Sequence, residues 1–208
     1  VARLSPSFVG SLDRDELRRH LYFSEDAPEA IPYHWSNLYR PGDLDWGLCV
    51  PKHFYSSLPE GEFFVELVTD TWPDSMAVLD FHVRGASPDT LLFNAHNCHP
   101  FQANDDVSGC AVGIQLFQLL ARMGDLNKSY RLLIAPELIG PVHWLNKLPE
   151  QEVQALEAAV MLKSVGSSGT LKLQHSFAGN TEIDVACSSI LRTLGKRVEE
   201  GKFRTIYG

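Results

Sequence analysis

Two strongly apolar runs, with a helical pattern between them, constrain the fold of this 208-residue chain more than any other feature. Residues 90–96 (TLLFNAH) and 130–135 (YRLLIA) are continuous apolar runs of the kind that lies buried on both faces of a central sheet. Between them, residues 108–123 place apolar side chains at the spacing of a helix. Strands that alternate with helices are the signature of the α/β class, which is therefore the predicted fold class.

Weaker patterns predict the remaining elements. Helices are expected in residues 12–21, with Ser11 as the N-cap, and in residues 150–159 and 180–194. Strand patterns occupy residues 62–68, 75–83, 159–165, 170–174 and 202–206. The turn-rich sequence DTWPD separates the first two of these strands, so we expect them to form a hairpin.

The domain organisation follows from a change in character along the chain. Residues 28–61 are rich in Pro, Trp and Tyr and have little periodicity, which indicates loops and short strands. Together with the expected hairpin, this change in composition predicts a small inserted β domain at residues 33–88. We expect residues 1–32 and 89–208 to form the main α/β domain around the insert, with 44% hydrophobic residues supplying the core.

Composition excludes several classes of protein. Asp and Glu number 26 against 18 Lys and Arg, which argues against a general binder of nucleic acid or anionic membranes. No apolar run approaches the roughly 20 residues that cross a bilayer, and the N-terminus lacks the hydrophobic stretch of a signal peptide. The four cysteines are scattered, which favours reduced thiols and a cytosolic protein.

The residues that carry chemistry are concentrated in 94–109, NAHNCHPFQANDDVSG. Here a buried strand ends in His96 and His99, and the following loop brings Asp105 and Asp106 to the start of a helix. Ligands of open α/β sheets bind outside the carboxyl ends of the strands. Imidazole and carboxylate groups that converge there have the composition of a zinc site.

A second strand end adds one more carboxylate. Glu137 follows the apolar run RLLIA and can face the same crevice as a metal ligand or a general base. The alternative interpretation is structural, because Asp105 or Asp106 with Ser108 could simply cap the helix, and His99 before a proline could form a turn.

At these residues the sequence resembles a known family. The run H-N-C-H-P-x-x-A-N-D-D-x-S-G, followed by a strand that ends P-E-x-I-G, resembles aminopeptidase-like zinc hydrolases related to leucyl aminopeptidases and glutaminyl cyclases. More narrowly, it is similar to a bacterial subgroup of aminopeptidase-like proteins. The resemblance implies a three-layer αβα zinc-exopeptidase-like fold with a mixed central sheet, interrupted by the small β insert.

The resemblance also implies roles for individual residues. Asp105 matches the metal-ligating aspartate, and His96 matches the first histidine ligand, with His99 as an alternative ligand. Glu137 matches the pair of glutamates that supplies a general base and a ligand, but only one carboxylate is present, so it is either base or ligand. If Glu137 is a ligand, Asp106 is the candidate base.

The chain departs from the family pattern at three positions. Cys98 replaces an acidic residue that orients the site, Pro136 replaces the first glutamate, and Lys163 replaces an aspartate ligand. The last change favours one Zn²⁺ ion instead of two. The family's final histidine ligand lies beyond residue 208, and we interpret His175, in the polar run LKLQHSF, as a surface residue.

The sequence therefore predicts a zinc-dependent aminopeptidase-like hydrolase, a metallopeptidase or amidohydrolase that cleaves an amide bond with metal-activated water. The expected partners are a small peptide or amide substrate and possible further copies of the chain, with no nucleic acid and no membrane. The alternatives are an inactive binding or scaffold protein of the peptidase fold and a single-zinc acyltransferase that resembles glutaminyl cyclase. Because the chain lacks an initiator Met and stops after a strand-like run, we expect it to be the first part of a larger catalytic domain.

Overall fold

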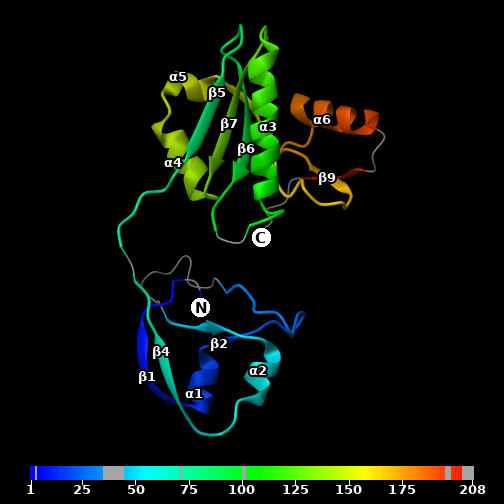
Figure 1. The fold of residues 1–208 in the computed structure, drawn as a ribbon. Coiled ribbons are helices and arrows are strands. Elements are labelled where there is room, and N and C mark those ends of the chain that lie inside the picture. The colour runs from blue at the N-terminus through cyan, green and yellow to red at the C-terminus, as the bar shows by residue number, and fades with distance from the viewer. Residues whose placement is uncertain (3, 35–44, 71, 100–101, 195–197, 203–208) are drawn as a thin grey trace. The chain divides into compact units, whose positions relative to one another are not determined.

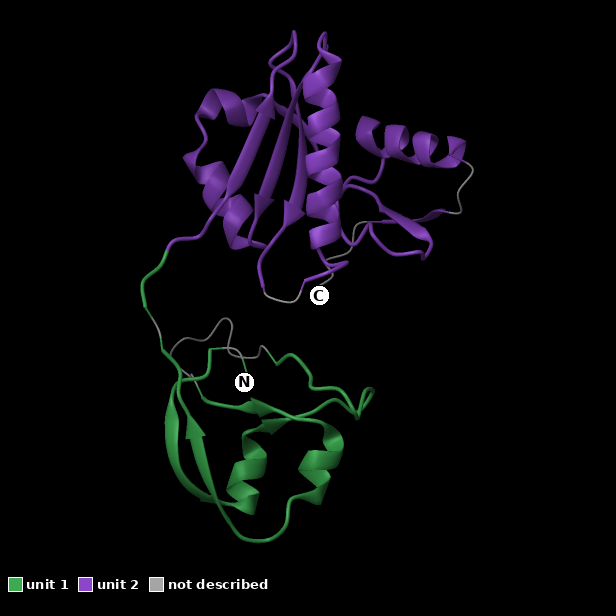
Figure 2. Ribbon diagram, viewed as in Figure 1, with its two compact units in different colours: residues 1–74 green, residues 75–208 purple. Residues whose placement is uncertain are grey.

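The computed structural model describes residues 1–2, 4–34, 45–70, 72–99, 102–194 and 198–202. The chain divides into two compact units, residues 1–74 (unit 1) and 75–208 (unit 2), each of which has its own sheets and helices (Figure 2). Of the strand predicted for residues 202–206, only Lys202 is among the described residues, so the prediction lies outside them.

Unit 1 is built from short elements around two small sheets (Figure 1). Its order is β1 (Phe8–Asp13), α1 (Arg14–Arg19), β2 (Leu21–Tyr22), β3 (Leu48–Cys49), α2 (Lys52–Ser57) and β4 (Glu62–Leu67). Strand β1 pairs antiparallel with β4, and β2 pairs parallel with β3. Its core consists of Leu17, Leu21, Trp46, Leu58, Val65 and Leu67.

Helix α1 begins later than the sequence predicts. The predicted N-cap Ser11 lies in β1, opposite Phe64 of β4, and Asp13 caps the helix by accepting the backbone N–H of Glu16 at 2.9 Å. The prediction of a helix over residues 12–21 is therefore wrong at its start, because pairing with a distant strand overrides the local helical signal.

The predicted hairpin between residues 62–68 and 75–83 is wrong. Strand β4 pairs with β1 in unit 1, whereas β5 (Leu79–Val83) pairs antiparallel with β7 (Ser129–Ala135) in unit 2. The boundaries of the two units accordingly differ from the predicted domain boundaries at 32/33 and 88/89, since β1 shares a sheet and a core with β4.

Unit 2 contains a four-stranded sheet in the order β5-β7-β6-β8. Strands β6 (Thr90–His96), β7 and β8 (Leu156–Met161) are parallel, and the antiparallel β5 makes the sheet mixed. The other elements are α3 (Val107–Met123), α4 (Ile139–Lys147), α5 (Glu150–Gln154), β9 (Leu171–Gln174), α6 (Glu182–Thr193) and β10 (Val198–Gly201), with β9 parallel to β10.

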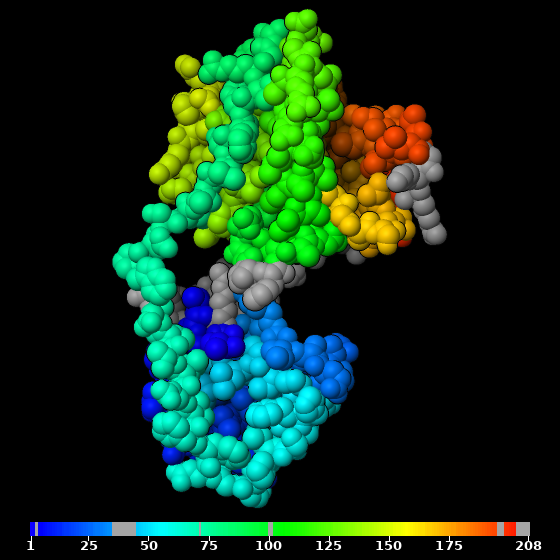
Figure 3. Space-filling view, viewed as in Figure 1, coloured from blue at the N-terminus to red at the C-terminus, as the bar shows by residue number. Residues whose placement is uncertain are grey.

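Helices cover both faces of this sheet, which explains why its central strands are continuously apolar. Leu132 of β7, 0% exposed, packs in one cluster with Phe117 of α3, and the next residue, Leu133, 1% exposed, packs in another with Trp144 of α4. Helix α3 lies along one face of the sheet (Figure 1), and its atoms form a continuous green band in the space-filling view (Figure 3). The predicted strands at residues 90–96 and 130–135 and the helix between them are confirmed.

One predicted helix is helical only in its first half. Of residues 150–159, only α5 is helical, and β8 begins at Leu156, which lies opposite Thr90 of β6. The sequence does not predict helix α4, because Gly140 and Pro141 in its first turn are weak helix formers. Gly140 is required there by close packing, since a Cβ would lie 2.6 Å from the Cβ of Ala135.

Candidate metal centre

His96 occupies the last position of β6, where the buried strand delivers its imidazole to the carboxyl end of the sheet. The residue is 2% exposed. Its Nε2 lies 2.8 Å from Oδ1 of Asp105, and its Nδ1 lies 3.4 Å from both Sγ of Cys98 and the amide nitrogen of Gln102. Both ring nitrogens therefore have polar neighbours, which fix the ring plane.

Asp106 anchors the loop that carries Asp105. It is 0% exposed, and its two carboxylate oxygens accept backbone N–H groups, from His96 at 3.1 Å and from Ser164 at 3.0 Å. The carboxylate thus ties the end of β6 to the segment after β8. The peptide bond between Asp105 and Asp106 is cis.

The glycine of the sequence motif is explained by the close approach of these segments. A Cβ on Gly109 would lie 2.0 Å from the carbonyl oxygen of Leu162 and 2.5 Å from Oδ1 of Asp106, so no larger residue fits. Asn104 adds a second tie by accepting the backbone N–H of Gly166 at 2.8 Å. Asn104, before the two aspartates, and Gly109, in the first turn of α3, therefore let the loop lie against the segment after β8.

Glu137 follows β7, the strand beside β6, and its side chain is held by Lys163. Lys163 Nζ donates to Glu137 Oε1 at 3.2 Å and lies 3.8 Å from Asp105 Oδ1. The two carboxylate oxygens cannot be farther apart than the sum of these distances. Burial alone lowers the pKa of Lys163, but the hydrogen bond and charge of Glu137, with the charges of Asp105 and Asp106, raise it overall. Lys163 is therefore an ammonium group at neutral pH.

The donor atoms of these side chains have the composition of a zinc site. Ligand atoms of His96, Cys98 and Glu137 all lie within 4.8 Å of one another, and Asp105 is hydrogen bonded to the same imidazole. Nitrogen, sulfur and carboxylate oxygen are the donors that Zn²⁺ takes, so the residues present fit this ion.

The sequence-predicted residues are brought together in part. His96, Asp105 and Glu137 converge, whereas His99 is exposed and is absent from the cluster found among the described residues. Cys98 joins the cluster although its role in the sequence analysis is only that of a departure from the family pattern. The signal for Cys98 is its position two residues after His96, which places both side chains on the same side of an extended chain.

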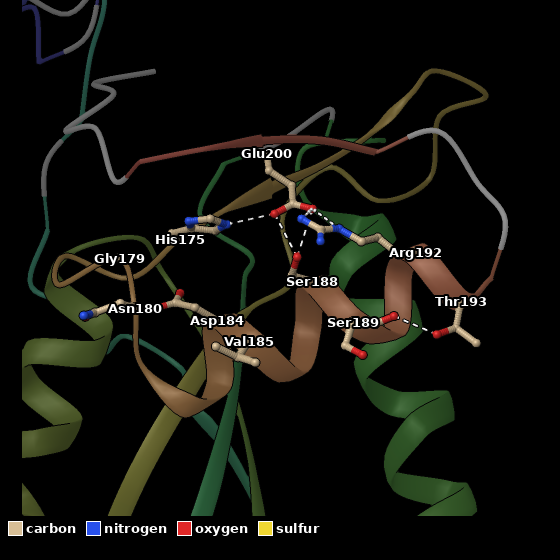
Figure 4. A pocket seen from close by; sticks show the side chains of 10 residues that line it. All are labelled: His175, Gly179, Asn180, Asp184, Val185, Ser188, Ser189, Arg192, Thr193 and Glu200. Carbon is tan, nitrogen blue, oxygen red and sulfur yellow. Dashed lines mark hydrogen bonds and ion pairs between the residues drawn. The ribbon is translucent and has the colours of Figure 1, made fainter.

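A hollow of about 530 Å³ lies between α6, β10 and the loop that follows β9 (Figure 4). Its polar groups pair with one another: Glu200 contacts His175 at 3.2 Å, Ser188 at 2.9 Å and Arg192 at 3.1 Å. These partners, with Ser188 foremost, hold the pKa of Glu200 below its ordinary value. His175 is 22% exposed and therefore less exposed than its polar sequence context suggests.

The fold of this chain has a counterpart among solved structures. It is similar to a crystal structure named "putative peptidase" from Clostridium acetobutylicum, with a TM-score of 0.84 and 24% identity over 98% of this chain and 47% of that chain. At this identity the similarity establishes a shared mixed α/β fold.

The sequence comparisons identify the family. The chain belongs to the family described as "Domain of unknown function (DUF4910)", whose model matches residues 42–208, and the DUF2172 model, with the same description, matches residues 1–70. A Clostridium acetobutylicum relative named "Putative polysaccharide biosynthesis protein with aminopeptidase-like domain" is 25% identical over 181 residues, 87% of this chain and 40% of that protein. The chain thus spans less than half the length of each relative and is their distant homologue.

None of the helices in the described part of the chain is long and apolar enough to cross a membrane.

Proposed function

We propose that this chain carries the zinc-binding region of an aminopeptidase-like hydrolase that cleaves an amide or peptide bond. The observation that supports the proposal best is the convergence of His96, Cys98 and Glu137, with donor atoms within 4.8 Å, at the carboxyl ends of adjacent parallel strands. Asp105, in contact with His96, supplies a further oxygen donor. The aminopeptidase-like domain of the relative points in the same direction.

His96 and Asp105 are the residues that would hold the ion, on the Nε2 side of the imidazole, whereas Cys98 lies on the Nδ1 side. When bound, zinc supplies Lewis acidity that acidifies water and polarises an amide carbonyl. Glu137 accepts the proton from water and returns it to the leaving amine, the ordinary role of a carboxylate beside a metal. The ammonium of Lys163, 3.2 Å from Glu137, keeps that carboxylate in place.

Asp106 is better suited to positioning than to proton transfer. Both of its oxygens accept backbone N–H groups and the residue is 0% exposed, so its carboxylate has no open side for water. This geometry favours Glu137 as the base over the alternative in which Glu137 is a ligand and Asp106 is the base. His99 remains a proposed alternative ligand.

The finer fold assignment is also a proposal. The two separate clusters of apolar side chains on opposite faces of β7 support a three-layer αβα arrangement of the zinc-exopeptidase kind.

A scaffold without catalytic activity is the second candidate, and the ion pair between Lys163 and Glu137 favours it, because a paired carboxylate is less available as a base. An activity assay separates the two functions. A panel of aminoacyl and N-acyl amides, tested with the zinc-loaded natural-length protein, gives hydrolysis if the first proposal is right and none if the protein is a scaffold.

Metal analysis tests the zinc site itself. We expect about one zinc ion per chain in the purified natural-length protein. Asp105→Ala should lower zinc affinity by more than about tenfold, because even a residue that only hydrogen-bonds to a metal ligand contributes about tenfold to the affinity. Asp125→Ala, on an exposed loop after α3, is the matched control and should leave zinc affinity unchanged. Purified protein that carries no divalent metal, and gains no activity when zinc is added, would contradict the enzyme hypothesis.

A further inference from the structure

We infer that Gln102 is a positioning residue that orients the imidazole of His96 for the ion, by turning its amide so that the carbonyl oxygen accepts the hydrogen of Nδ1. The inference rests on the proposed zinc site and goes beyond it, because it assigns the second nitrogen of the imidazole to an uncharged side chain outside the predicted donor set.

The amide of Gln102 is paired at its nitrogen and not at its oxygen. The nitrogen lies 3.4 Å from Nδ1 of His96 and 3.9 Å from Sγ of Cys98. The carbonyl oxygen is buried and is one of three buried side-chain atoms that, within the described part of the chain, have no hydrogen-bond partner. Such atoms are rare in folded proteins, so one beside a candidate ligand needs a functional explanation.

The hydrogen bonds of the structure place the single hydrogen of the neutral imidazole on Nε2. This nitrogen lies 2.8 Å from Oδ1 of Asp105, and a carboxylate only accepts, so Nε2 is the donor. Nδ1 is then an acceptor, and the N–H₂ of Gln102 faces it as a donor. The present orientation of the amide thus matches an imidazole whose Nε2 carries the hydrogen.

Ligation through Nε2 reverses these roles. The lone pair of Nε2 is then used by the ion, so the proton of Nε2 leaves to water and Nδ1 takes one up from water, with no change in the charge of the ring. A half-turn of the Gln102 amide exchanges its nitrogen and oxygen without changing its shape. The oxygen then accepts the Nδ1–H, which is how ligating imidazoles are ordinarily oriented, and the buried oxygen gains its missing partner.

Cys98 is the competing partner for Nδ1. Its Sγ also lies 3.4 Å from that nitrogen, but the residue is exposed and sulfur is a weak acceptor. The carbonyl oxygen of Gln102 is the stronger acceptor, and the orientation of the ring is therefore assigned to Gln102. In the opposite arrangement, with the ion on Nδ1 beside Cys98, Nε2 keeps its hydrogen and Gln102 has no role.

Zinc affinity tests the role of Gln102, by titration of natural-length protein against a competing chelator. Gln102→Leu removes the acceptor and keeps much of the volume, and it should bind zinc roughly tenfold more weakly. Gln102→Glu offers an acceptor oxygen in either orientation and should restore at least the natural affinity. Gln118→Leu, at an exposed position of α3, is the matched control and should leave the affinity unchanged.

A spectroscopic measurement separates this role from a merely structural one and needs no variant. In natural-length protein labelled with ¹⁵N-histidine, zinc should move the ring hydrogen of His96 from Nε2 to Nδ1 and give an Nδ1–H resonance that is protected from exchange with water. In Gln102→Leu at saturating zinc that resonance should be lost to exchange, and Gln102→Glu should restore it.

The outcomes distinguish the two proposals. Unchanged zinc affinity in a Gln102→Leu that is folded by circular dichroism would overturn the role of Gln102 while leaving the zinc site intact. A His96 that keeps its hydrogen on Nε2 with zinc bound, together with weaker zinc binding in Cys98→Ala, would overturn it in favour of an ion on Nδ1. A natural protein that binds no zinc would overturn the proposed function, and the inference with it.

Discussion

The substitution Asp106→Asn tests how the candidate site is held together. The side chain keeps its shape, but an amide has one acceptor oxygen, whereas the carboxylate accepts two backbone N–H groups, from His96 at 3.1 Å and Ser164 at 3.0 Å. One of the two N–H groups would then face an amide N–H₂, donor against donor, at a position that is 0% exposed.

The expected cost follows from these contacts. A hydrogen bond to a charged group contributes about 1.5–3 kcal/mol, and a buried donor without a partner costs about 1–3 kcal/mol. Because one bond is lost and the other becomes neutral, Asp106→Asn should lower the free energy of unfolding of unit 2 by about 3 kcal/mol. For a unit of this size, that corresponds to a decrease in Tm of roughly 10 °C.

The assay is thermal and urea unfolding followed by circular dichroism, with amide hydrogen exchange at His96 and Ser164 as a local measurement. Asp125→Asn on the exposed loop after α3 is the matched control, and we expect it to change stability by less than about 0.5 kcal/mol. A loss below about 1 kcal/mol, or unchanged exchange at both amides, would refute the reasoning. Unchanged stability with abolished activity would instead favour Asp106 as the general base.

Two further predictions concern packing and pH. Gly109→Ala should unfold or displace the start of α3, at a cost of more than about 3 kcal/mol, because its Cβ would overlap the carbonyl oxygen of Leu162, and the loss should appear in urea unfolding. Burial raises the pKa of Asp80, but the hydrogen bonds and charge of Arg131 outweigh it and hold that pKa below its ordinary value. Asp80 therefore contributes stability that is present at neutral pH and is lost as pH falls below about 4. Asp80→Asn should flatten the pH dependence of Tm in that range, and an unchanged slope would contradict this assignment.

The elements that could be predicted from sequence are those whose signal is local and strong. Strands β6 and β7 and helix α3 were recognisable because burial on both faces makes a strand apolar at every position and the helix carries apolar side chains at regular spacing. Short or weakly periodic elements are not predicted, such as α4 with Gly140 and Pro141, and the last two residues of β1, Leu12 and Asp13, are predicted as the start of a helix.

The candidate site was predictable to a similar degree. His96, Asp105 and Glu137 stand out because imidazole and carboxylate groups follow buried strands, and parallel strands place their carboxyl ends at one edge. The contact between Lys163 and Glu137 was not predictable from spacing. It depends on how the segments after β7 and β8 meet, at a distance that no local pattern encodes.

The sequence by itself determined the α/β class, the central strands and the kinds of donor atom at their ends, because these follow from residue type and periodicity. Only the tertiary structure decided that β1 pairs with β4, that β5 joins β7, that Asp106 is buried between two backbone N–H groups, and that an ammonium lies between two carboxylates. The physical reason is that strand partners and charge neighbours are chosen by contacts between residues far apart in the chain, whose energies are realised only when the whole unit packs.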